Sequence, residues 1–292
     1  MSYVSSEIES QPSSWRRAIE LLPSLAAALP ERGERVAVIG CGTSWFMAEA
    51  YAALRESAGM GETDFYTASA LPSSRKYDRV LAISRSGTTT EVVDALAGTS
   101  ARRTSIVTDA STPVGEVSDD CVVLDFADEQ SVVQTVFATT TLMLLRASLG
   151  ESLDHVIAEA EQVLRETPDP RVDAASQYTF LGQGWPHGIA REAALKMREA
   201  SRSWTESYPQ MEYRHGPISI AEPGRVVWVF GQPVHDLLDD VRATGATVVC
   251  DDLDPVSDLL RVQLLAVRLA EAAGLDPDRP RNLTRSVVLG AP

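Results

Sequence analysis

The chain has 292 residues, of which 44% are hydrophobic and 23% are charged, the proportions of a globular protein and not of a disordered one. Acidic residues outnumber basic ones by 41 to 26, which gives a net charge of −15. This charge excludes general nucleic-acid binding, which needs a basic surface. An anionic ligand would have to be held locally, by backbone amides, hydroxyls and a few cations.

The cysteine pattern and the N-terminal sequence indicate where the protein works. Cys41, Cys121 and Cys250 are far apart and in no metal-ligand spacing, which indicates a reducing compartment without disulfides. The N-terminal residues show no basic segment followed by an apolar core, so we expect no signal peptide. The longest apolar runs are too short to cross a membrane. We therefore expect a soluble, cytoplasmic protein without a membrane partner.

Short β-rich runs alternate with helical segments, the pattern of a parallel sheet covered on both faces. The predicted strands of the first half are 35–39, 64–67, 79–83, 104–108 and 121–125. Its predicted helices are 45–57, 89–97, 131–149 and 151–164. A Pro-rich break at 166–170 indicates a domain boundary. The expected organisation is an N-terminal arm or helix over 1–30, one domain over 31–165 and a second over 166–292.

The second half repeats the first. The segment 178–184 (YTFLGQG) echoes 36–42 (VAVIGCG), and the predicted strand 226–230 corresponds to 80–84. A further strand at 247–250 corresponds to 105–108. Because strand, Gly-x-Gly turn, helix and strands recur in one order, we predict two similar α/β domains.

Gly40-x-Gly42, between a strand and a helix, resembles the opening of a dinucleotide-binding turn. The third glycine of that fingerprint is replaced by Trp45, and in the second copy by His187. A tight strand-to-helix turn explains the glycines without a ligand. The four histidines are dispersed, with no metal-ligand spacing, so we expect neither a cofactor nor a metal.

A hydroxyl-rich loop over 83–91 (ISRSGTTTE) follows a predicted strand and leads into a helix. Five Ser or Thr residues, Gly87 and Arg85 stand where free helix N–H groups point outward. Amides, hydroxyls and the helix dipole all favour an anion there. One hydroxyl would indicate only an N-cap, but the density of hydroxyls predicts a phosphate site.

Five motifs now point to a known family. They are 41–44 (CGTS) with 84–89 (SRSGTT), 192–199 (EAALKMRE), 212–217 (EYRHGP), 278–286 (DRPRNLTRS) and the opening segment 7–15. In this order, over nearly the whole chain, they resemble the double sugar-isomerase (SIS) domain family, and within it the isomerase half of the glucosamine-6-phosphate synthases. The resemblance implies an α/β fold of two flavodoxin-like, doubly wound parallel-sheet SIS domains in tandem. It also implies a homodimer with a sugar-phosphate site shared between subunits.

The resemblance assigns roles to particular residues. Those expected to bind the phosphate or line the sugar are Cys41, Gly42, Thr43, Ser44, Ser84, Arg85, Ser86, Thr89 and Val132. Glu199 corresponds to the base that moves a proton between C1 and C2, and Lys196 to a lysine near the sugar. His215 corresponds to a ring-opening residue that reaches in from the neighbouring subunit.

The same residues have simpler interpretations when they are taken alone. Glu192 and Lys196 are four apart, which predicts a solvated ion pair worth about 0.3 kcal/mol. His215 precedes Gly216-Pro217 and could simply lead into a helix. The order of the motifs, and no single residue, favours the catalytic interpretation.

The sequence departs from the family in three places. The 34 residues before the first predicted strand contain no cysteine, so we expect no glutaminase domain and no glutamine-driven synthesis. Arg285 replaces the C-terminal lysine of the synthases, and Val136 replaces another. Arginine stays protonated and cannot form a Schiff base, although Arg285 still belongs to the expected catalytic set with Glu199, His215 and Lys196.

These features predict an enzyme that acts on an amino-sugar 6-phosphate, of the glucosamine or N-acetylglucosamine type. Ring opening and removal of the C2 proton would give isomerisation or deamination. The open alternatives are a dehydratase (lyase) that eliminates the C3 hydroxyl of an N-acetylhexosamine 6-phosphate, a deglycase of a sugar-phosphate amino-acid adduct, and a non-catalytic sugar-phosphate sensor. The sequence leaves open the N-substituent, the configuration at C4 and the fate of the C2 carbanion.

Overall fold

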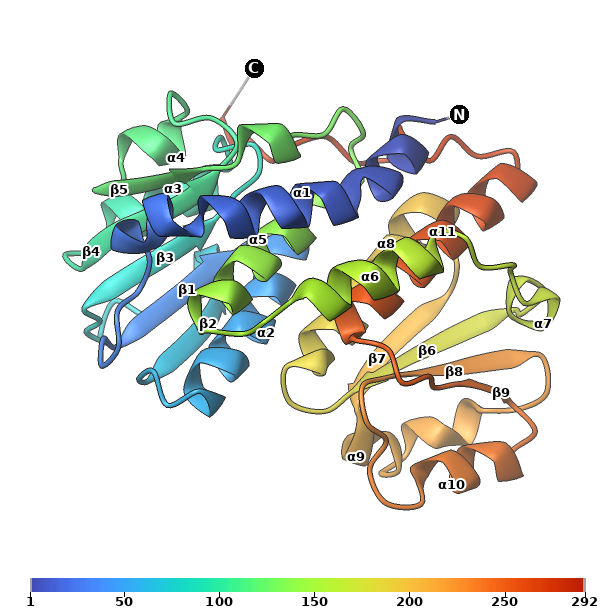
Figure 1. Ribbon diagram of the computed structural model, residues 1–292. Helices are drawn as coiled ribbons and strands as arrows, with labels where there is room; N and C mark the ends of the chain where they lie inside the picture. Colours follow the sequence, from blue (N-terminus) through green and yellow to red (C-terminus); the bar gives the residue numbers. More distant parts are fainter. Residues whose placement is uncertain (1, 291–292) are drawn as a thin grey trace. The chain divides into compact units, whose positions relative to one another are not determined.

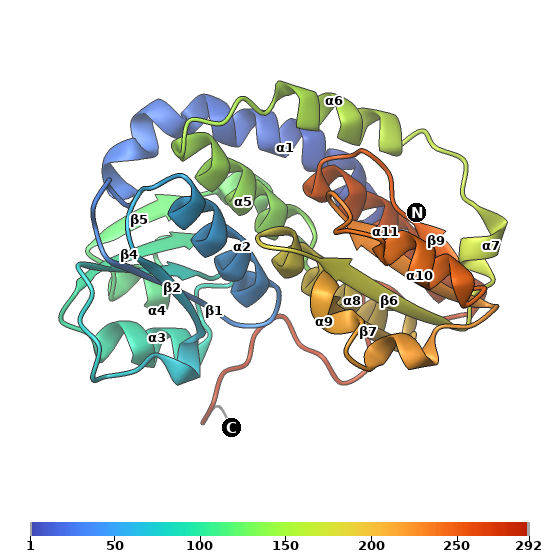
Figure 2. The ribbon, with the colours of Figure 1, turned by 90° about the horizontal axis from the view of Figure 1, so that it is seen from below.

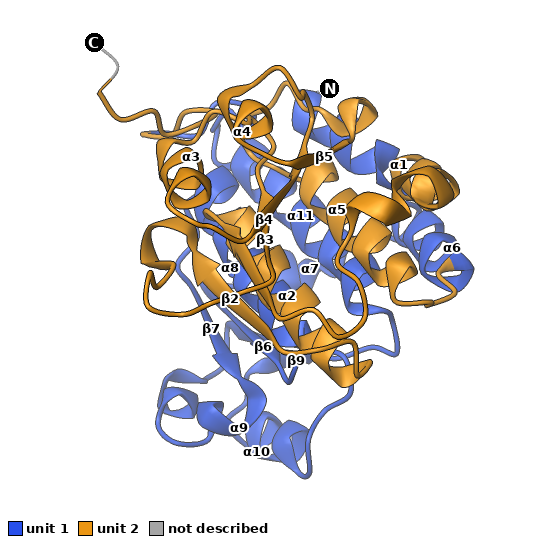
Figure 3. Ribbon diagram, turned by 90° about the vertical axis from the view of Figure 1, so that its left-hand side faces the viewer, with its two compact units in different colours: residues 1–12, 154–281 blue, residues 13–153, 282–292 orange. Residues whose placement is uncertain are grey.

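The computed structural model describes residues 2–290. They divide into two compact units, which are described separately (Figure 3). Unit 1 comprises residues 1–12 and 154–281, and unit 2 comprises residues 13–153 and 282–292. Helix α1 (Tyr3–Leu25) begins in unit 1 and ends in unit 2.

Unit 2 is built on a five-stranded parallel sheet in the order β2-β1-β3-β4-β5 (Figure 1). Its strands are β1 (Val36–Gly40), β2 (Thr63–Thr67), β3 (Arg79–Ile83), β4 (Arg102–Val107) and β5 (Asp120–Val123). Its helices are α2 (Thr43–Ser57), α3 (Thr90–Ala97), α4 (Pro113–Glu116) and α5 (Val136–Ser148), with short 3-10 turns η1 (Ala26–Ala28), η2 (Ala68–Ala70) and η3 (Asp125–Ala127). Every residue of β1 and β3 is buried, as expected of strands covered on both faces.

Helices cover both faces of this sheet (Figure 2). On one face Val92 and Leu96 of α3 and Val114 of α4 join a core cluster with strand residues such as Ile39 and Ala82. Helices α2 and α5 pack against one another, and α2 packs against β1. The strand order is that of flavodoxin-like sheets.

Unit 1 has a four-stranded parallel sheet in the order β7-β6-β8-β9. Its strands are β6 (Gln177–Gly182), β7 (Thr205–Pro209), β8 (Arg225–Phe230) and β9 (Thr247–Val249). Its helices are α6 (Asp154–Val163), α7 (Pro170–Asp173), α8 (Pro186–Ser201), α9 (Gln210–Tyr213), α10 (Leu237–Ala243) and α11 (Pro255–Ala272), with the 3-10 turn η4 (Pro217–Ile220). The order matches the first four strands of unit 2, and the chain continues from β9 into α11 without a fifth strand.

The repeated glycines occupy equivalent turns in the two sheets. A Cβ on Gly40 would lie 2.6 Å from the backbone carbon of Ser44, and one on Gly182 would lie 2.3 Å from the Pro186 carbonyl oxygen. Gly42 and Gly184 both have positive φ, +55° and +69°. Close backbone approach and left-handed geometry therefore account for both Gly-x-Gly pairs without a dinucleotide.

The predicted α/β class with parallel sheets is confirmed, and the strand expected at 79–83 has the predicted bounds. The helix expected from residue 131 begins instead at Val136, and strand β7 was not predicted. The chain passes from unit 2 to unit 1 at residue 154, and the tail from residue 282 belongs to unit 2. The domain limits 31–165 and 166–292 stay a prediction. Within residues 2–290 no helix is long and apolar enough to span a membrane.

Candidate functional site

Two loops of unit 2 meet at the point where its strand order reverses. Strands β1 and β3 are neighbours, and the chain leaves β1 towards β2 on one side and β3 towards β4 on the other. Ligands of open parallel sheets bind at such a switch point, beyond the carboxyl ends of the strands. The Gly-x-Gly turn after β1 and the hydroxyl-rich loop 84–89 after β3 both lie there.

The hydroxyl-rich loop 84–89 is held in one conformation by bonds within unit 2. The Ser84 N–H donates to the Ile106 carbonyl (3.0 Å), and the Thr108 hydroxyl donates to the Arg85 carbonyl (2.8 Å). Gly87 has φ +62°, and a Cβ there would lie 2.0 Å from Thr112 Oγ1. The loop is therefore fastened to β4 and to the turn before α4.

The serine hydroxyls of this loop are oriented by backbone donors. The Gly87 N–H donates to Ser84 Oγ (3.2 Å), and the Thr88 N–H donates to Ser86 Oγ (3.3 Å). Because each oxygen accepts a bond, its O–H proton is left to donate elsewhere. Thr89 is the N-cap of α3, yet its side chain makes no capping bond. The simple N-cap explanation therefore does not account for Thr89.

A small pocket with an empty volume of about 250 Å³ opens beside this loop. Its lining residues are Cys41, Ser44, Ile83, Ser84, Arg85, Ser86, Thr89, Val92, Gln134 and Arg285. The four hydroxyl residues predicted to hold phosphate are therefore brought together. Among the described residues, Gly42, Thr43 and Val132 do not line this pocket.

Cys41 in this pocket is not a nucleophile near neutral pH. Burial, together with the nearby Glu91 carboxylate, raises the pKa of the Cys41 thiol to about 11. The Cys41 Sγ donates to Glu91 Oε2 at 3.8 Å. A protonated thiol can contribute packing and a weak bond to a ligand, but no covalent chemistry.

Arg85 is buried and bonds to the segment 129–132. Its guanidinium donates to the carbonyls of Ser131 (3.0 Å) and Val132 (3.2 Å). It also lies 3.7 Å from the Glu129 carboxylate, and both side chains are fully buried. These contacts fix the 129–132 segment, a role that the sequence did not indicate. The predicted contact of Arg85 with phosphate stays a prediction.

Glu129 caps helix α5 from a distance along the chain. Its Oε1 accepts the Val136 N–H (2.8 Å) and the Thr135 hydroxyl (3.0 Å), and its Oε2 accepts the Phe137 N–H (3.2 Å). A carboxylate at a helix N-terminus is stabilised by the free amides and the helix dipole. Sequence reasoning missed Glu129 because it expected the helix to begin at 131.

The C-terminal tail of unit 2 lies along the phosphate loop. The Arg285 guanidinium bonds to the Asp128 carboxylate and the Glu129 carbonyl. The Thr88 and Ser286 hydroxyls bond at 2.9 Å, and the Leu289 N–H donates to Thr90 Oγ1 at 2.9 Å. The tail therefore uses Thr88 and Thr90, whereas Ser84, Ser86 and Thr89 face the pocket. Arg285 lines the pocket while it anchors the tail.

In unit 1, helix α8 buries a lysine between two carboxylates. The Lys196 Nζ lies 3.6 Å from Glu192 Oε1 and forms an ion pair with Glu199. The side chains of Lys196 and Glu192 are only 2% and 1% exposed, so the expectation of a solvated pair is wrong. Glu199, at 19%, is the member that reaches the surface. Buried charges are costly unless paired, and they often mark functional positions.

His215 lies in the exposed turn after α9. Its N–H donates to the Glu212 carbonyl (3.0 Å), and the next residue, Gly216, has φ +143°. The imidazole is thus available at the surface of unit 1. That it acts across a subunit interface stays a prediction.

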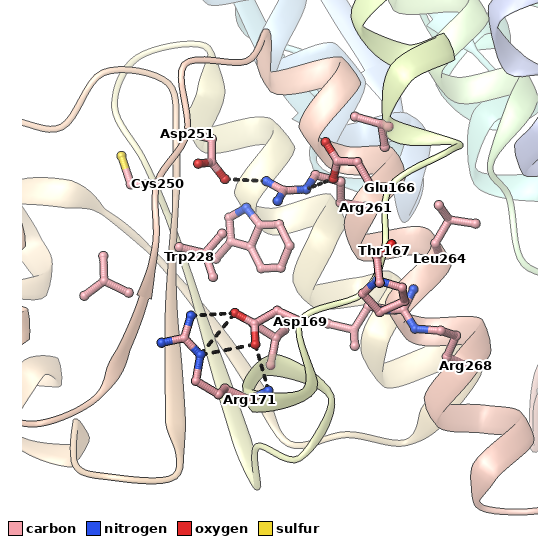
Figure 4. Close-up of a pocket in the computed structure, with 16 residues that line it drawn as sticks. Glu166, Thr167, Asp169, Arg171, Trp228, Cys250, Asp251, Arg261, Leu264 and Arg268 are labelled. Carbon is pink, nitrogen blue, oxygen red and sulfur yellow. Dashed lines mark hydrogen bonds and ion pairs between the residues drawn. The ribbon is translucent and has the colours of Figure 1, made fainter.

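A larger cavity, with an empty volume of about 890 Å³, lies in unit 1 beside β9 (Figure 4). Its charged side chains are paired: Arg261 with Glu166 (2.8 Å), Arg171 with Asp169 (2.7 Å) and Arg268 with Asp173 (2.8 Å). With a carboxylate beside each guanidinium, this cavity lacks the local positive charge that a phosphate needs. Within residues 2–290, no group of three His, Cys, Asp or Glu residues could hold a metal.

Comparison with known proteins identifies the homologues of this chain. No family model matches it. It is 28% identical to glutamine–fructose-6-phosphate aminotransferase (isomerizing) of Methanothermobacter thermautotrophicus, over 97% of this chain and 57% of that protein. The chain therefore spans a little over half the length of the curated relatives it matches.

Two solved structures have the same fold. Glucosamine-6-phosphate deaminase of Thermotoga maritima has a TM-score of 0.82 and 25% identity, with 99% of this chain and all of that chain covered. Tagatose-6-phosphate ketose/aldose isomerase of Escherichia coli has a TM-score of 0.82 and 18% identity, with 97% of each chain covered. The homologues are thus proteins of the phosphosugar isomerase type.

Proposed function

We propose that this chain is a sugar-phosphate enzyme of the isomerase type, which binds an amino-sugar 6-phosphate and removes its C2 proton. The observation that carries the proposal is the convergence of Ser44, Ser84, Ser86 and Thr89 on one pocket at the N-terminus of α3. Ser84 and Ser86 each have an O–H free to donate, which suits a phosphate dianion. The homologues act on phosphosugars by their names, which supports the same substrate class.

The proposed chemistry is proton transfer at a carbon next to a carbonyl. Once the ring is open, the C1 aldehyde acidifies the C2 proton, and Glu199 removes it as a general base. Lys196, paired with Glu199, balances the carboxylate charge. Reprotonation at C1 yields a C2 imine from a free amine, and addition of water then releases ammonia and leaves the ketose. His215 is proposed to assist ring opening from the partner subunit of a cytoplasmic homodimer.

The contacts of Arg285 favour a route without a covalent lysine. Its guanidinium is engaged by Asp128 and the Glu129 carbonyl, so it anchors the tail and does not attack the sugar carbonyl. With an N-acetylated substrate, loss of ammonia is blocked and the same carbanion would expel the C3 hydroxyl. Dehydration is therefore the second candidate reaction.

Proton exchange in D2O tests the proposal. The protein is incubated with glucosamine 6-phosphate, N-acetylglucosamine 6-phosphate, galactosamine 6-phosphate and fructose 6-phosphate, and each is followed by proton NMR. We expect one of the aldose phosphates to lose its C2 proton signal. Glu199→Gln should slow this exchange at least about 100-fold, whereas Glu271→Gln, an exposed control on α11, should not.

The products decide between the candidate reactions. A ketose with ammonia indicates a deaminase, a ketose alone an isomerase, and a vinyl proton a dehydratase. Release of an amino acid from a sugar-phosphate adduct would indicate a deglycase. If a sugar phosphate binds and none exchanges its C2 proton, the protein is a sensor and the enzymatic proposal is wrong.

A further inference from the structure

The pocket beside the phosphate loop holds a polar atom that the protein itself leaves unbonded. Gln134 lines this pocket with Ser84, Ser86 and Thr89. Its Oε1 is sealed from solvent and has no hydrogen-bond partner among the described residues. An unmet acceptor of this kind destabilises a folded protein, because its bonds to water are lost and not replaced. Native structures retain so few of them that each calls for an explanation.

The backbone that carries Gln134 is fixed on both sides. On one side Arg85 binds the carbonyls of Ser131 and Val132. On the other side Glu129 accepts the Val136 N–H at 2.8 Å. Between them the Ser131 hydroxyl donates to the Val133 carbonyl at 2.8 Å. The backbone therefore presents this side chain to the pocket before any ligand arrives, as a preorganised binding site would.

The chemistry of the pocket tells which ligand group this amide would meet. The dianionic phosphate of a phosphosugar, a monoester, offers only acceptors, so it would pair with the hydroxyls of Ser84, Ser86 and Thr89 and not with an amide carbonyl. The Gln134 carbonyl needs a donor, an O–H or N–H on the organic part of the ligand. A phosphorylated polyol or amino sugar carries such donors on carbons within a few bonds of its phosphate, whereas inorganic phosphate has a donor only in its own P–OH group.

We infer that Gln134 is a specificity-determining residue, which accepts a hydrogen bond from the sugar backbone beside the phosphate and so selects phosphosugars over bare phosphate. This inference rests on the proposed function. The inference adds Gln134 to the site. Its Oε1, which accepts no hydrogen bond in the free protein, would accept one from the ligand in the complex.

The inference predicts opposite effects of one substitution on stability and on binding. Methionine has nearly the length of glutamine and no strong acceptor, so Gln134→Met removes the unmet bond from the free protein. Its thermal midpoint should be equal to or above that of the parent. The same change should weaken binding of the open-chain analogue glucitol 6-phosphate about tenfold, while the Kd for inorganic phosphate stays within about twofold.

Calorimetric titration with both ligands and thermal unfolding of the free protein measure these quantities. Gln162→Met, on an exposed face of α6, is the matched control and should change neither Kd. Gln134→Glu keeps the shape and adds a negative charge. It should weaken both ligands more than about tenfold, because the carboxylate repels the phosphate.

Each outcome bears on the inference. A Gln134→Met protein with a clearly lowered thermal midpoint and an unchanged Kd ratio would make Gln134 a structural residue and overturn it. Unchanged phosphate binding in Gln134→Glu would place the side chain away from the phosphate and overturn it as well. If the parent protein binds phosphate but no phosphosugar, the proposed function fails too. If the parent binds glucitol 6-phosphate and the methionine variant binds it equally, the inference alone fails.

Discussion

The hydroxyl residues of the loop after β3 differ in what they can do because they differ in partners. Thr88 and Thr90 bond to Ser286 and Leu289 of the tail. Ser84 and Ser86 accept backbone N–H groups and keep a proton to donate. The run of hydroxyls at a helix start marks all of these residues as one group in the sequence. The run alone does not separate them, because the tail residues that distinguish them are about 200 positions away. The predicted phosphate set of Ser84, Ser86 and Thr89 comes from the resemblance to the SIS family.

Cys41 gives a prediction at the scale of one residue. Its thiol pKa of about 11 means that only about one molecule in a thousand carries the thiolate at pH 8. In a Cys121→Ser/Cys250→Ser protein, alkylation of Cys41 by iodoacetamide should be slow and should rise about tenfold per pH unit from pH 8 to 10. Replacing Glu91 by Gln should lower the thiol pKa and speed the reaction. A rate that levels off near pH 9 would show that the thiol is not perturbed.

At the scale of elements, buried strands were predictable and the edges of the fold were not. Strand β3 is a continuous apolar run because helices cover both of its faces. Strand β7 lies at a sheet edge, and its residues Thr205–Pro209 show no such run. The start of α5 was misplaced for a different reason. The residues from 131 to 135 include no proline or glycine to mark a helix boundary, but Glu129 and Arg85 hold them in another conformation.

The same distant contacts hid part of the site. Ser44 and the loop 84–89 could be placed together because both follow parallel strands, whose carboxyl ends share one edge. Glu129 and Gln134 lie six or more positions beyond the end of β5, after the turn η3. Their positions depend on a buried guanidinium 44 or more positions earlier in the chain, and a single sequence gives no local signal for that contact.

Glu129 gives a prediction at this scale. Glu129→Ala removes the cap of α5. It also removes the carboxylate that lies beside the buried Arg85 guanidinium. The free energy of unfolding, measured with urea, should fall by about 3 kcal/mol. Glu116→Ala, an exposed change in the same unit, should cost less than about 0.5 kcal/mol. The double variant Glu129→Gln/Arg85→Met should lose less unfolding free energy than Glu129→Ala alone. A larger loss in the double variant would argue against the ion pair.

At the scale of the whole molecule, acidic residues dominate, and Asp258 is among those buried in unit 1. Burial raises the pKa of Asp258 to about 6, although Trp228 and Arg261 bind its carboxylate. Trp228 Nε1 donates to it at 2.7 Å. Because the folded pKa lies above the unfolded value of 3.8, the folded state takes up the proton more readily. This group therefore lowers stability above pH 6, and that penalty disappears as the pH falls through 6 to 4.

Asp258→Asn tests this pH dependence. Asparagine keeps an acceptor for the Trp228 N–H and does not titrate. The difference in unfolding free energy between the parent and this variant should shift in favour of the parent by up to about 3 kcal/mol as the pH falls from 7 to 4. Urea unfolding at several pH values, followed by tryptophan fluorescence, gives this difference. Parallel curves for the two proteins would show that Asp258 has an ordinary pKa.

The path of the chain through its two units has a consequence for biosynthesis. Unit 1 takes residues 1–12 from one end of the sequence and 154–281 from the other, and unit 2 is completed by residues from 282 onward. The backbone N–H groups of Tyr3 and Val4 donate to the Asp278 carboxylate at 2.9 and 2.8 Å. These two bonds can form only after the chain has been synthesised as far as Asp278. Unit 1 is therefore completed only after the whole of segment 13–153, which belongs to unit 2, has been made.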